Sequence, residues 1–328
     1  MALASIYDLV TPQWVKDTFL RGLDNYLQDE DGIPFPESMY EQSTSQAIAG
    51  VQAELDLCLD VTTITQERQD WNSEDINACI PLYVFQRPLH SVQALRWKYG
   101  QLRIFTVPAT WLNILNPIFG RLHVIPTALS PSVTLTTNVF PYFFNNSNYM
   151  PGWWDIDYTA GFRYYKGSAT IAQGQQTATV TFASDEQFLS SNYAVYTTRS
   201  GPNAADLLME PQIVSKGVGG FTIKMPTAVA GTSLTVNWVV SDLPADLRQV
   251  LGIRAALLPL VTAGDLVLGA GVQGGQIGVD GLSQQLSTTK AGAAGGAFAG
   301  RVNALQTQAL DLMNNLRGKY RPMNMMGV

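Results

Sequence analysis

The feature that most constrains this chain is a long apolar segment that begins at Asp242-Leu243-Pro244. An acidic residue followed by a proline in the first turn is a typical helix start, because the acid caps free N–H groups and proline needs no donor there. The apolar positions that follow are too broadly spread for a surface helix; they include Leu247, Val250, Leu251, Leu257, Leu258 and Val261. We therefore predict the central buried helix of a core domain, with a kink at Pro259 and breaks at Gly264 and Gly269.

Directly after this helix, Gly269 to Gly274 match the G-x-G-x-x-G pattern of dinucleotide-binding loops. Such a loop must follow a strand and open an apolar helix within a βαβ unit. Leu266 to Leu268 could pass for the strand, but the loop is followed by Gly278, by Asp280-Gly281 and by the polar residues 283–289. We therefore do not expect nucleotide binding here, and we predict no cofactor.

Composition narrows the class of protein. The chain has 328 residues, which allows two domains. It is 46% hydrophobic and only 14% charged, against about 25% charged in average globular chains. A surface so poor in charge is expected where neighbouring subunits cover much of it. The net charge of -6 argues against a nucleic-acid binder, which would present a basic face.

Cysteine usage and hydropathy give little sign of secretion or membrane insertion. Cys58 and Cys79 lie in segments predicted as core, and they form neither a zinc spacing nor a disulfide framework. The N-terminus shows no basic region followed by an apolar run, so no signal peptide is expected. Residues 255–272 come closest to a membrane span, but Pro259 and Asp265 interrupt them. We expect a soluble protein made inside the cell.

The first half of the chain predicts two helices and then strands. Thr11-Pro12 starts a helix whose apolar face continues to Leu27, and a second helix from about Met39 carries apolar residues at helical spacing up to Leu59. From Ile80 the period becomes that of strands. The predicted strands are residues 80–85, 91–99, 102–107, 121–125, 132–139 and 153–158, with a turn at 99–101.

Residues 166–241 read as an inserted antiparallel β-sandwich. Apolar residues alternate there between turns such as Ser200-Gly201-Pro202; they are Ala178, Val180, Phe182, Phe221, Ile223, Met225, Leu234, Val236, Trp238 and Val240. Because the helical pattern returns at Asp242, the two ends of the insertion must lie close together on the host domain. The prediction is an α+β fold with a discontinuous core of helices and a strand-rich segment (1–165 and 242–316).

The C-terminal part combines a helix and a docking tail. Residues 291–300 are an Ala/Gly run, and the last predicted helix, about 301–316, ends at Gly318. Residues 317–328 are basic and then methionine-rich, a composition that cannot fold alone. The candidate partner-binding residues are Arg317, Lys319, Tyr320, Arg321, Met323, Met325 and Met326.

Several short sequence motifs, taken in this order, resemble those of a known protein family. They are the Thr-Pro helix start (9–27), the Ala-Ile…Leu helix (47–55), Arg-Pro-Leu-x-Ser-Val (87–92), Asp-Tyr-Thr-Ala-Gly-Phe (157–162), Leu-Pro-Ala-Asp-Leu-Arg (243–248) with 263–266, and Asp-Gly-Leu-Ser-Gln (280–284). Together they resemble the head–tail connector (adaptor) proteins of tailed bacteriophages. In that family the Tyr-Thr-Ala-Gly-Phe segment runs almost directly into the Pro-x-Asp-Leu helix, whereas roughly eighty residues intervene here. The insertion is similar to immunoglobulin-like modules of phage virions, on Gly174-Gln175 and 179–182.

The resemblance implies a structural role in the head–tail neck of a virion whose proteins are made in the host cytoplasm. It implies a ring of identical subunits, twelve-fold by resemblance, that docks beneath the portal protein and meets a tail terminator or other neck proteins. DNA would pass through as cargo only, and no membrane is involved. Residues 317–328 would dock into the portal or a neighbour, and the inserted sandwich would decorate the neck or contact a collar component.

Other interpretations of single features stay open. His90 and His123 are expected to be structural; Asp29-Glu30-Asp31 and Asp155/Asp157 are expected in solvated loops, with Ca²⁺ binding as the alternative. The aromatic residues of 149–165 predict core or interface packing, or a sugar-binding platform. The basic positions 301, 317, 319 and 321 could face DNA in a ring lumen, acidic grooves of a partner, or solvent. The alternative function is a tail or collar protein whose sandwich binds carbohydrate or decorates the virion. We expect no enzyme, and a nucleotide-using enzyme is the third class considered.

Overall fold

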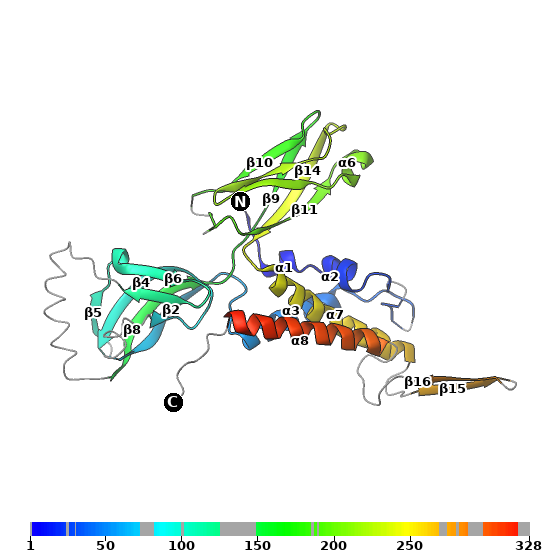
Figure 1. Ribbon diagram of the computed structural model, residues 1–328, viewed down its shortest axis with the longest axis horizontal. Coiled ribbons are helices and arrows are strands. Elements are labelled where there is room, and N and C mark those ends of the chain that lie inside the picture. Colours follow the sequence, from blue (N-terminus) through cyan, green and yellow to red (C-terminus); the bar gives the residue numbers. More distant parts are fainter. Residues whose placement is uncertain are drawn as a thin grey trace. The chain divides into compact units, whose positions relative to one another are not determined.

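The computed structural model describes residues 2–23, 26–29, 31–72, 82–99, 102–124, 149–184, 187–188, 190–268, 274–279, 282–287 and 298–320. They form helices and antiparallel sheets, which confirms the α+β class (Figure 1). The chain divides into two compact units. Unit 1 contains residues 1–51 and 163–318, and unit 2 contains residues 52–162 and 319–328.

Unit 1 contains the predicted helices and two short ones that were not predicted, and the second predicted helix ends at Leu55 rather than continuing to Leu59. The helices are α1 (Ile6–Leu9), α2 (Pro12–Phe19), α3 (Glu37–Leu55), the short α6 (Ala204–Leu208), α7 (Ala245–Leu268) and α8 (Ala299–Tyr320), and the last residues of α3 and α8 fall in unit 2. The predicted start of α2 at Thr11-Pro12 is confirmed, and the Thr11 hydroxyl caps the helix by accepting a hydrogen bond from the Trp14 N–H at 3.1 Å. The predicted continuation to Leu27 is wrong, because α2 ends at Phe19 and Gly22 turns the chain with φ +81.

α7 is the predicted central helix, and the predicted break at Gly264 is wrong because α7 runs unbroken to Leu268. Pro259 has no N–H to donate to the Ala255 carbonyl four residues earlier. In the structure the buried Ser43 hydroxyl of α3 donates to that carbonyl at 2.7 Å. A side chain of a neighbouring helix therefore replaces the hydrogen bond that proline removes.

Replacing Ser43 tests whether its hydroxyl takes the place of the N–H donor that Pro259 lacks. Ser43→Ala should leave the buried Ala255 carbonyl without its partner and lower the free energy of unfolding by about 1–3 kcal/mol. In a Pro259→Ala background the helix regains its own N–H donor, so the same change should cost much less. Urea unfolding of the four proteins measures this coupling. An equal cost in both backgrounds would show that the hydroxyl does not stand in for the missing donor.

Two antiparallel sheets in unit 1 share one core. One has the order β1 (Ala2–Leu3), β9 (Tyr164–Ala172), β14 (Ser233–Ser241), β11 (Ala194–Ser200), and the other β10 (Thr177–Thr181), β13 (Gly220–Lys224), β12 (Gln212–Gly217). Strand alternation places every second side chain on the same face. The predicted inward residues Val180, Phe182, Phe221, Ile223, Met225, Leu234, Val236, Trp238 and Val240 are all buried, and Ala178 packs half-buried against them.

Arg248 of α7 connects these sheets to the helices. Its guanidinium carbon lies 4.0 Å from the ring centres of both Trp14 in α2 and Tyr196 in β11. Its Nε and Nη2 atoms donate to the Leu9 carbonyl at 3.2 and 3.0 Å. Arginine suits this position, because a planar cation can stack on two aromatic rings while its edge donates hydrogen bonds.

Asp242 lies where the chain returns from β14 to α7. One of its carboxylate oxygens accepts a hydrogen bond from the Arg163 N–H at 2.8 Å. Burial raises the pKa of Asp242 from 3.8 to about 6, and the contacts with Arg163 offset only part of that increase. The folded chain therefore binds this proton more tightly than the unfolded chain. The corresponding stability is complete below about pH 4 and is lost as the pH rises through about 6.

Asp242→Asn should stabilise the protein at neutral pH, because the amide oxygen can still accept the Arg163 hydrogen bond without a buried charge. The gain in the free energy of unfolding at pH 7.5 is expected to be at most about 3 kcal/mol. The difference between variant and parent should shrink toward zero below about pH 4. Denaturant unfolding from pH 4 to 8 measures it, and a difference that does not depend on pH would contradict the assignment.

A β-hairpin that was not predicted follows α7. β15 (Gly274–Val279) and β16 (Leu282–Ser287) are paired in antiparallel register, from Val279 opposite Leu282 to Gly274 opposite Ser287. The polar residues 283–287 therefore belong to a strand. The two residues between the strands in sequence, Asp280-Gly281, are a pair typical of two-residue hairpin turns.

The strand-rich segment forms unit 2, with a core of its own. One sheet has the order β2 (Thr62–Asn72), β8 (Tyr149–Ala160), β4 (Leu89–Tyr99), β5 (Leu102–Thr106), and the other β3 (Leu82–Tyr83), β7 (Arg121–Val124), β6 (Leu112–Asn116), which follows a 3₁₀ turn at Ala109–Trp111. The predicted strands 91–99, 102–107, 121–125 and 153–158 are confirmed, whereas β2 and β6 were not predicted. The predicted strand 80–85 is too long, because β3 ends at Tyr83. The predicted strand 132–139 lies outside the described residues. This segment was grouped with the helices from the sequence, but the buried cluster around Trp97, Trp153 and Tyr158 makes it a separate unit.

Candidate partner-binding surface

α8 has one buried stripe and one exposed face. Leu305 and Leu312, both predicted on its apolar face, are half-buried. The predicted helix end at Gly318 is wrong, because α8 continues through this glycine to Tyr320. A glycine within a helix costs only about 1 kcal/mol, and burial of Tyr320 holds the last turn in place. The fully buried stripe consists of Val302, Ala309, Met313, Leu316 and Tyr320.

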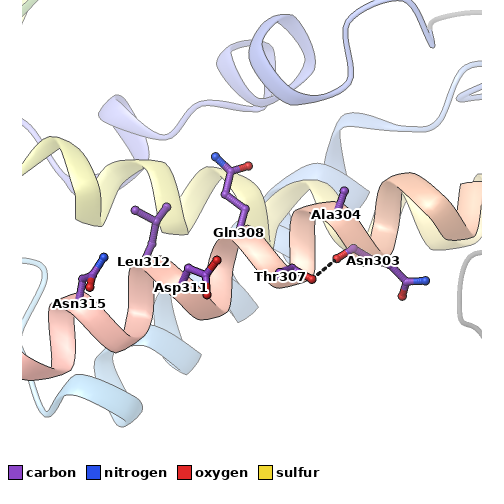
Figure 2. A pocket seen from close by; sticks show the side chains of 7 residues that line it. All are labelled: Asn303, Ala304, Thr307, Gln308, Asp311, Leu312 and Asn315. Carbon is purple, nitrogen blue, oxygen red and sulfur yellow. Dashed lines mark hydrogen bonds between the residues drawn. The ribbon is translucent and has the colours of Figure 1, made fainter.

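The opposite side of α8 carries a shallow groove that side chains of this helix alone form (Figure 2). Its small residues are Ala304 and Thr307, and the Thr307 hydroxyl is turned back to donate to the Asn303 carbonyl at 2.9 Å. Longer side chains border these small ones and leave a hollow between them. The lining residues are Asn303, Ala304, Thr307, Gln308, Asp311, Leu312 and Asn315.

The chemistry of this groove favours contact with a protein. A groove on one helix lacks the enclosing walls of a small-molecule site. Its amide and hydroxyl groups can donate or accept, and Asp311 is the one charged side chain in the lining, which disfavours a phosphate backbone. Arg301, one of the basic positions considered for DNA, donates to the Phe19 carbonyl at 2.6 Å and so stabilises the helices of unit 1.

The predicted docking residues fall into three groups. Arg317 and Lys319 are exposed on the last turns of α8, and Arg317 Nη1 donates to the Asn314 side chain at 3.2 Å. Tyr320 is only 1% exposed, so its ring packs within the chain. The residues outside the described part of the chain are Arg321, Met323, Met325 and Met326.

Arg87 was not predicted as a site residue, yet it holds the end of α8. This buried side chain donates from Nη1 to the Tyr320 carbonyl at 2.9 Å and from Nη2 to the Asp56 carboxylate at 3.0 Å. The last carbonyls of a helix have no partner within it, and a cation beside them also interacts well with the helix dipole. Arg87 therefore fixes the point from which residues 321–328 continue. The sequence signal was its place in the Arg-Pro-Leu motif.

The elements around the glycine-rich loop do not form a dinucleotide-binding unit. Leu266 to Leu268 belong to α7 rather than to a strand, and β15 rather than a helix follows the loop. A helix precedes residues 269–273 and a strand follows them, whereas the binding loop needs a strand before it and a helix after it. Residues 269–273 themselves lie outside the described residues.

The carboxylates for which Ca²⁺ binding was the alternative have structural partners, and the predicted solvated loop is wrong for Asp155 and Asp157, because both lie on the strand β8. Asp155 is fully buried and forms ion pairs with Arg96, at 3.3 Å, and with Lys98. Asp157 pairs with the same Arg96, and this hydrogen bond lowers the pKa of Asp157. Asp29 accepts hydrogen bonds from two N–H groups of its own loop. Among the residues that the structure describes, no three metal-ligating side chains are grouped.

The aromatic side chains that the structure describes in residues 149–165 belong to protein cores. Trp153, Trp154, Tyr158, Phe162, Tyr164 and Tyr165 are buried, which favours packing over a sugar-binding platform. His90 and His123 lie on β4 and β7. Burial and the nearby Asp56 raise the pKa of the Cys58 thiol, which disfavours the reactive thiolate. Cys79 lies outside the described residues.

One helix in the described part of the chain is long and apolar enough to cross a membrane. It is Ala245–Leu266 of α7, with a mean hydropathy of 1.3, and 56% of it is buried inside the protein. Core helices of the same length and composition pass this test, so it is weak evidence for a span.

Comparison with protein-family models finds no match to this chain, and comparison with curated proteins finds none either. The interpretation of the surface therefore depends on its own chemistry and on the sequence motifs.

Proposed function

We propose that this chain is a head–tail adaptor of a tailed bacteriophage, a structural subunit of a ring that joins the portal to the tail and continues the DNA channel. The observation that carries the proposal is the exposed side of α8. This 22-residue helix presents a nearly uncharged groove of amide, hydroxyl and small side chains. Such a face suits a protein contact, because its polar groups can pair with donors or acceptors of a neighbour when water is excluded.

In this proposal the helices of unit 1 and the strands of unit 2 form the adaptor core. Heterologous contacts, in which the α8 face of one subunit meets a different face of the next, close the ring, with twelve copies by resemblance. Residues 166–241 are the inserted immunoglobulin-like sandwich, and the two sheets with a shared core support this assignment. The sandwich would decorate the neck or meet a collar component.

The remaining partners follow from the same resemblance. The C-terminal segment docks on the portal protein, a tail terminator or another neck protein binds elsewhere, and DNA passes as cargo. The protein then resides in the virion neck, acts without a cofactor and is not an enzyme.

The alternative, a collar protein whose sandwich binds carbohydrate, gains no support from the described surface. Sugar-binding platforms use exposed aromatic rings, whereas the large exposed hydrophobic side chains described in residues 164–241 are the aliphatic Leu208, Val214 and Val218.

Removal of residues 321–328 tests portal docking. Truncation after Tyr320 keeps this buried side chain and the contact of its carbonyl with Arg87, so the fold should survive. We expect the portal protein to capture the full chain but not the truncated chain in a pull-down. The circular dichroism spectrum and the melting temperature of the truncated chain should stay near those of the full chain. If the portal protein captured the truncated chain at full yield, residues 321–328 would have no role in portal docking.

Thr307→Arg tests the groove of α8. A long charged side chain in the hollow should weaken subunit contacts at least about tenfold, a change of about 1.4 kcal/mol. Gln306→Arg is the matched control, because Gln306 is the adjacent residue and is exposed but does not line the groove. Copy number on the portal, measured by native mass spectrometry, should fall for Thr307→Arg alone. Equal ring occupancy for both variants would exclude the groove as a ring contact.

A further inference from the structure

Unit 2 has an exposed apolar patch beside the end of α8. Tyr83 and Phe85 flank the buried Val84 and are 44% and 62% exposed, and Ile118 is 36% exposed. We call Tyr83, Phe85 and Ile118 the Phe85 patch. Its parts are held together because the Val84 N–H donates to the Gly120 carbonyl at 3.0 Å, within the turn that carries Ile118. Exposed apolar side chains that are grouped rather than scattered favour a contact site.

The patch lies next to the point where the C-terminal segment leaves α8. Phe85 is two residues from Arg87, whose Nη1 donates to the Tyr320 carbonyl at 2.9 Å. The stem of Arg87 also packs on the turn that carries Ile118, since a Cβ at Gly120 would lie 3.0 Å from Arg87 Cγ. The eight residues 321–328 thus start beside the patch, and they can reach about 26–29 Å when extended.

The composition of that segment matches the patch. It contains Met323, Met325 and Met326 within the sequence Arg-Pro-Met-Asn-Met-Met-Gly-Val. Methionine side chains are flexible, fill irregular surfaces and make favourable sulfur–aromatic contacts. A segment tethered this closely has an effective concentration on the order of mM, which favours it over a free partner at micromolar protein concentrations.

We propose that in the free subunit residues 321–328 fold back and cover the Phe85 patch of their own chain through the methionine side chains. Arg87 acts as the positioning residue that aims the segment at the patch. If the segment also docks on the portal, which rests on the proposed function, then docking uncovers Phe85 and makes the patch available to a neighbour only in the assembled ring.

Photo-crosslinking tests the contact in the full-length chain. Phe85 is replaced by p-benzoyl-phenylalanine, and the same residue at Leu102, which is 70% exposed on β5 of unit 2, is the matched control. We expect adducts to residues 321–328 from position 85 and none from position 102. Their yield should not change on dilution, because the contact is within one chain. Replacing the three methionines by serine in the position-85 protein should abolish the adducts while the melting temperature is kept.

The other outcomes overturn the proposal. Adducts to residues 73–81 or 125–148 would mean that another part of unit 2 covers the patch, and adducts whose yield falls on dilution would mean that a second copy does. Absence of adducts from position 85 would mean that the patch is uncovered. The crosslinking experiment contains no portal protein. Its result therefore tests the fold-back contact alone, and the pull-down tests portal docking alone.

Discussion

The packing of the helices depends on how the buried carbonyl of Ala255 is satisfied. Pro259 removes its donor within α7, and an unpaired buried carbonyl would cost about 1–3 kcal/mol. Ser43 supplies the donor from α3, which fixes the position of α3 along α7 as well as the continuity of α7. On its α2 side, α7 has Gly252, where a Cβ would lie 2.3 Å from the Phe19 ring. One hydroxyl and one missing side chain therefore set two of the helix contacts in unit 1.

The same requirement accounts for three further charged side chains that are buried or half-buried. Arg248 satisfies the Leu9 carbonyl at the end of α1, and Arg87 satisfies the Tyr320 carbonyl at the end of α8. The buried carboxylate of Asp206 accepts from the N–H groups of Ala230 and Gly231 at 3.1 and 2.8 Å. In each case a charged side chain far away in sequence completes backbone hydrogen bonding that helices and turns leave open.

The sequence predicted those elements whose burial pattern is local and regular. The alternation from Leu234 to Val240 reports the burial of its own residues and is confirmed. The apolar run of α7 is confirmed in part, because its first predicted residues (Leu247, Val250, Leu251) are buried, whereas the later ones (Leu257, Leu258, Val261) are half-buried. What could not be predicted depends on distant partners. Nothing near Pro259 reveals Ser43, and nothing near Gly318 reveals that Tyr320 is buried. The hairpin of β15 and β16 is different, because Asp280-Gly281 between two short segments was a usable turn signal.

The positions of the charged residues affect which surfaces are suited to contact with another protein segment. The chain has only 14% charged residues, and some of them pair with one another, including Arg96 with Asp155 and Lys166 with Asp8. The groove of α8 is lined by one charged side chain, Asp311, and the three residues of the Phe85 patch are uncharged. Repulsion between like charges normally keeps soluble chains apart. Under the two proposals, a surface that lacks this protection is covered in each case, the groove of α8 by a neighbour in the ring and the Phe85 patch by the C-terminal segment.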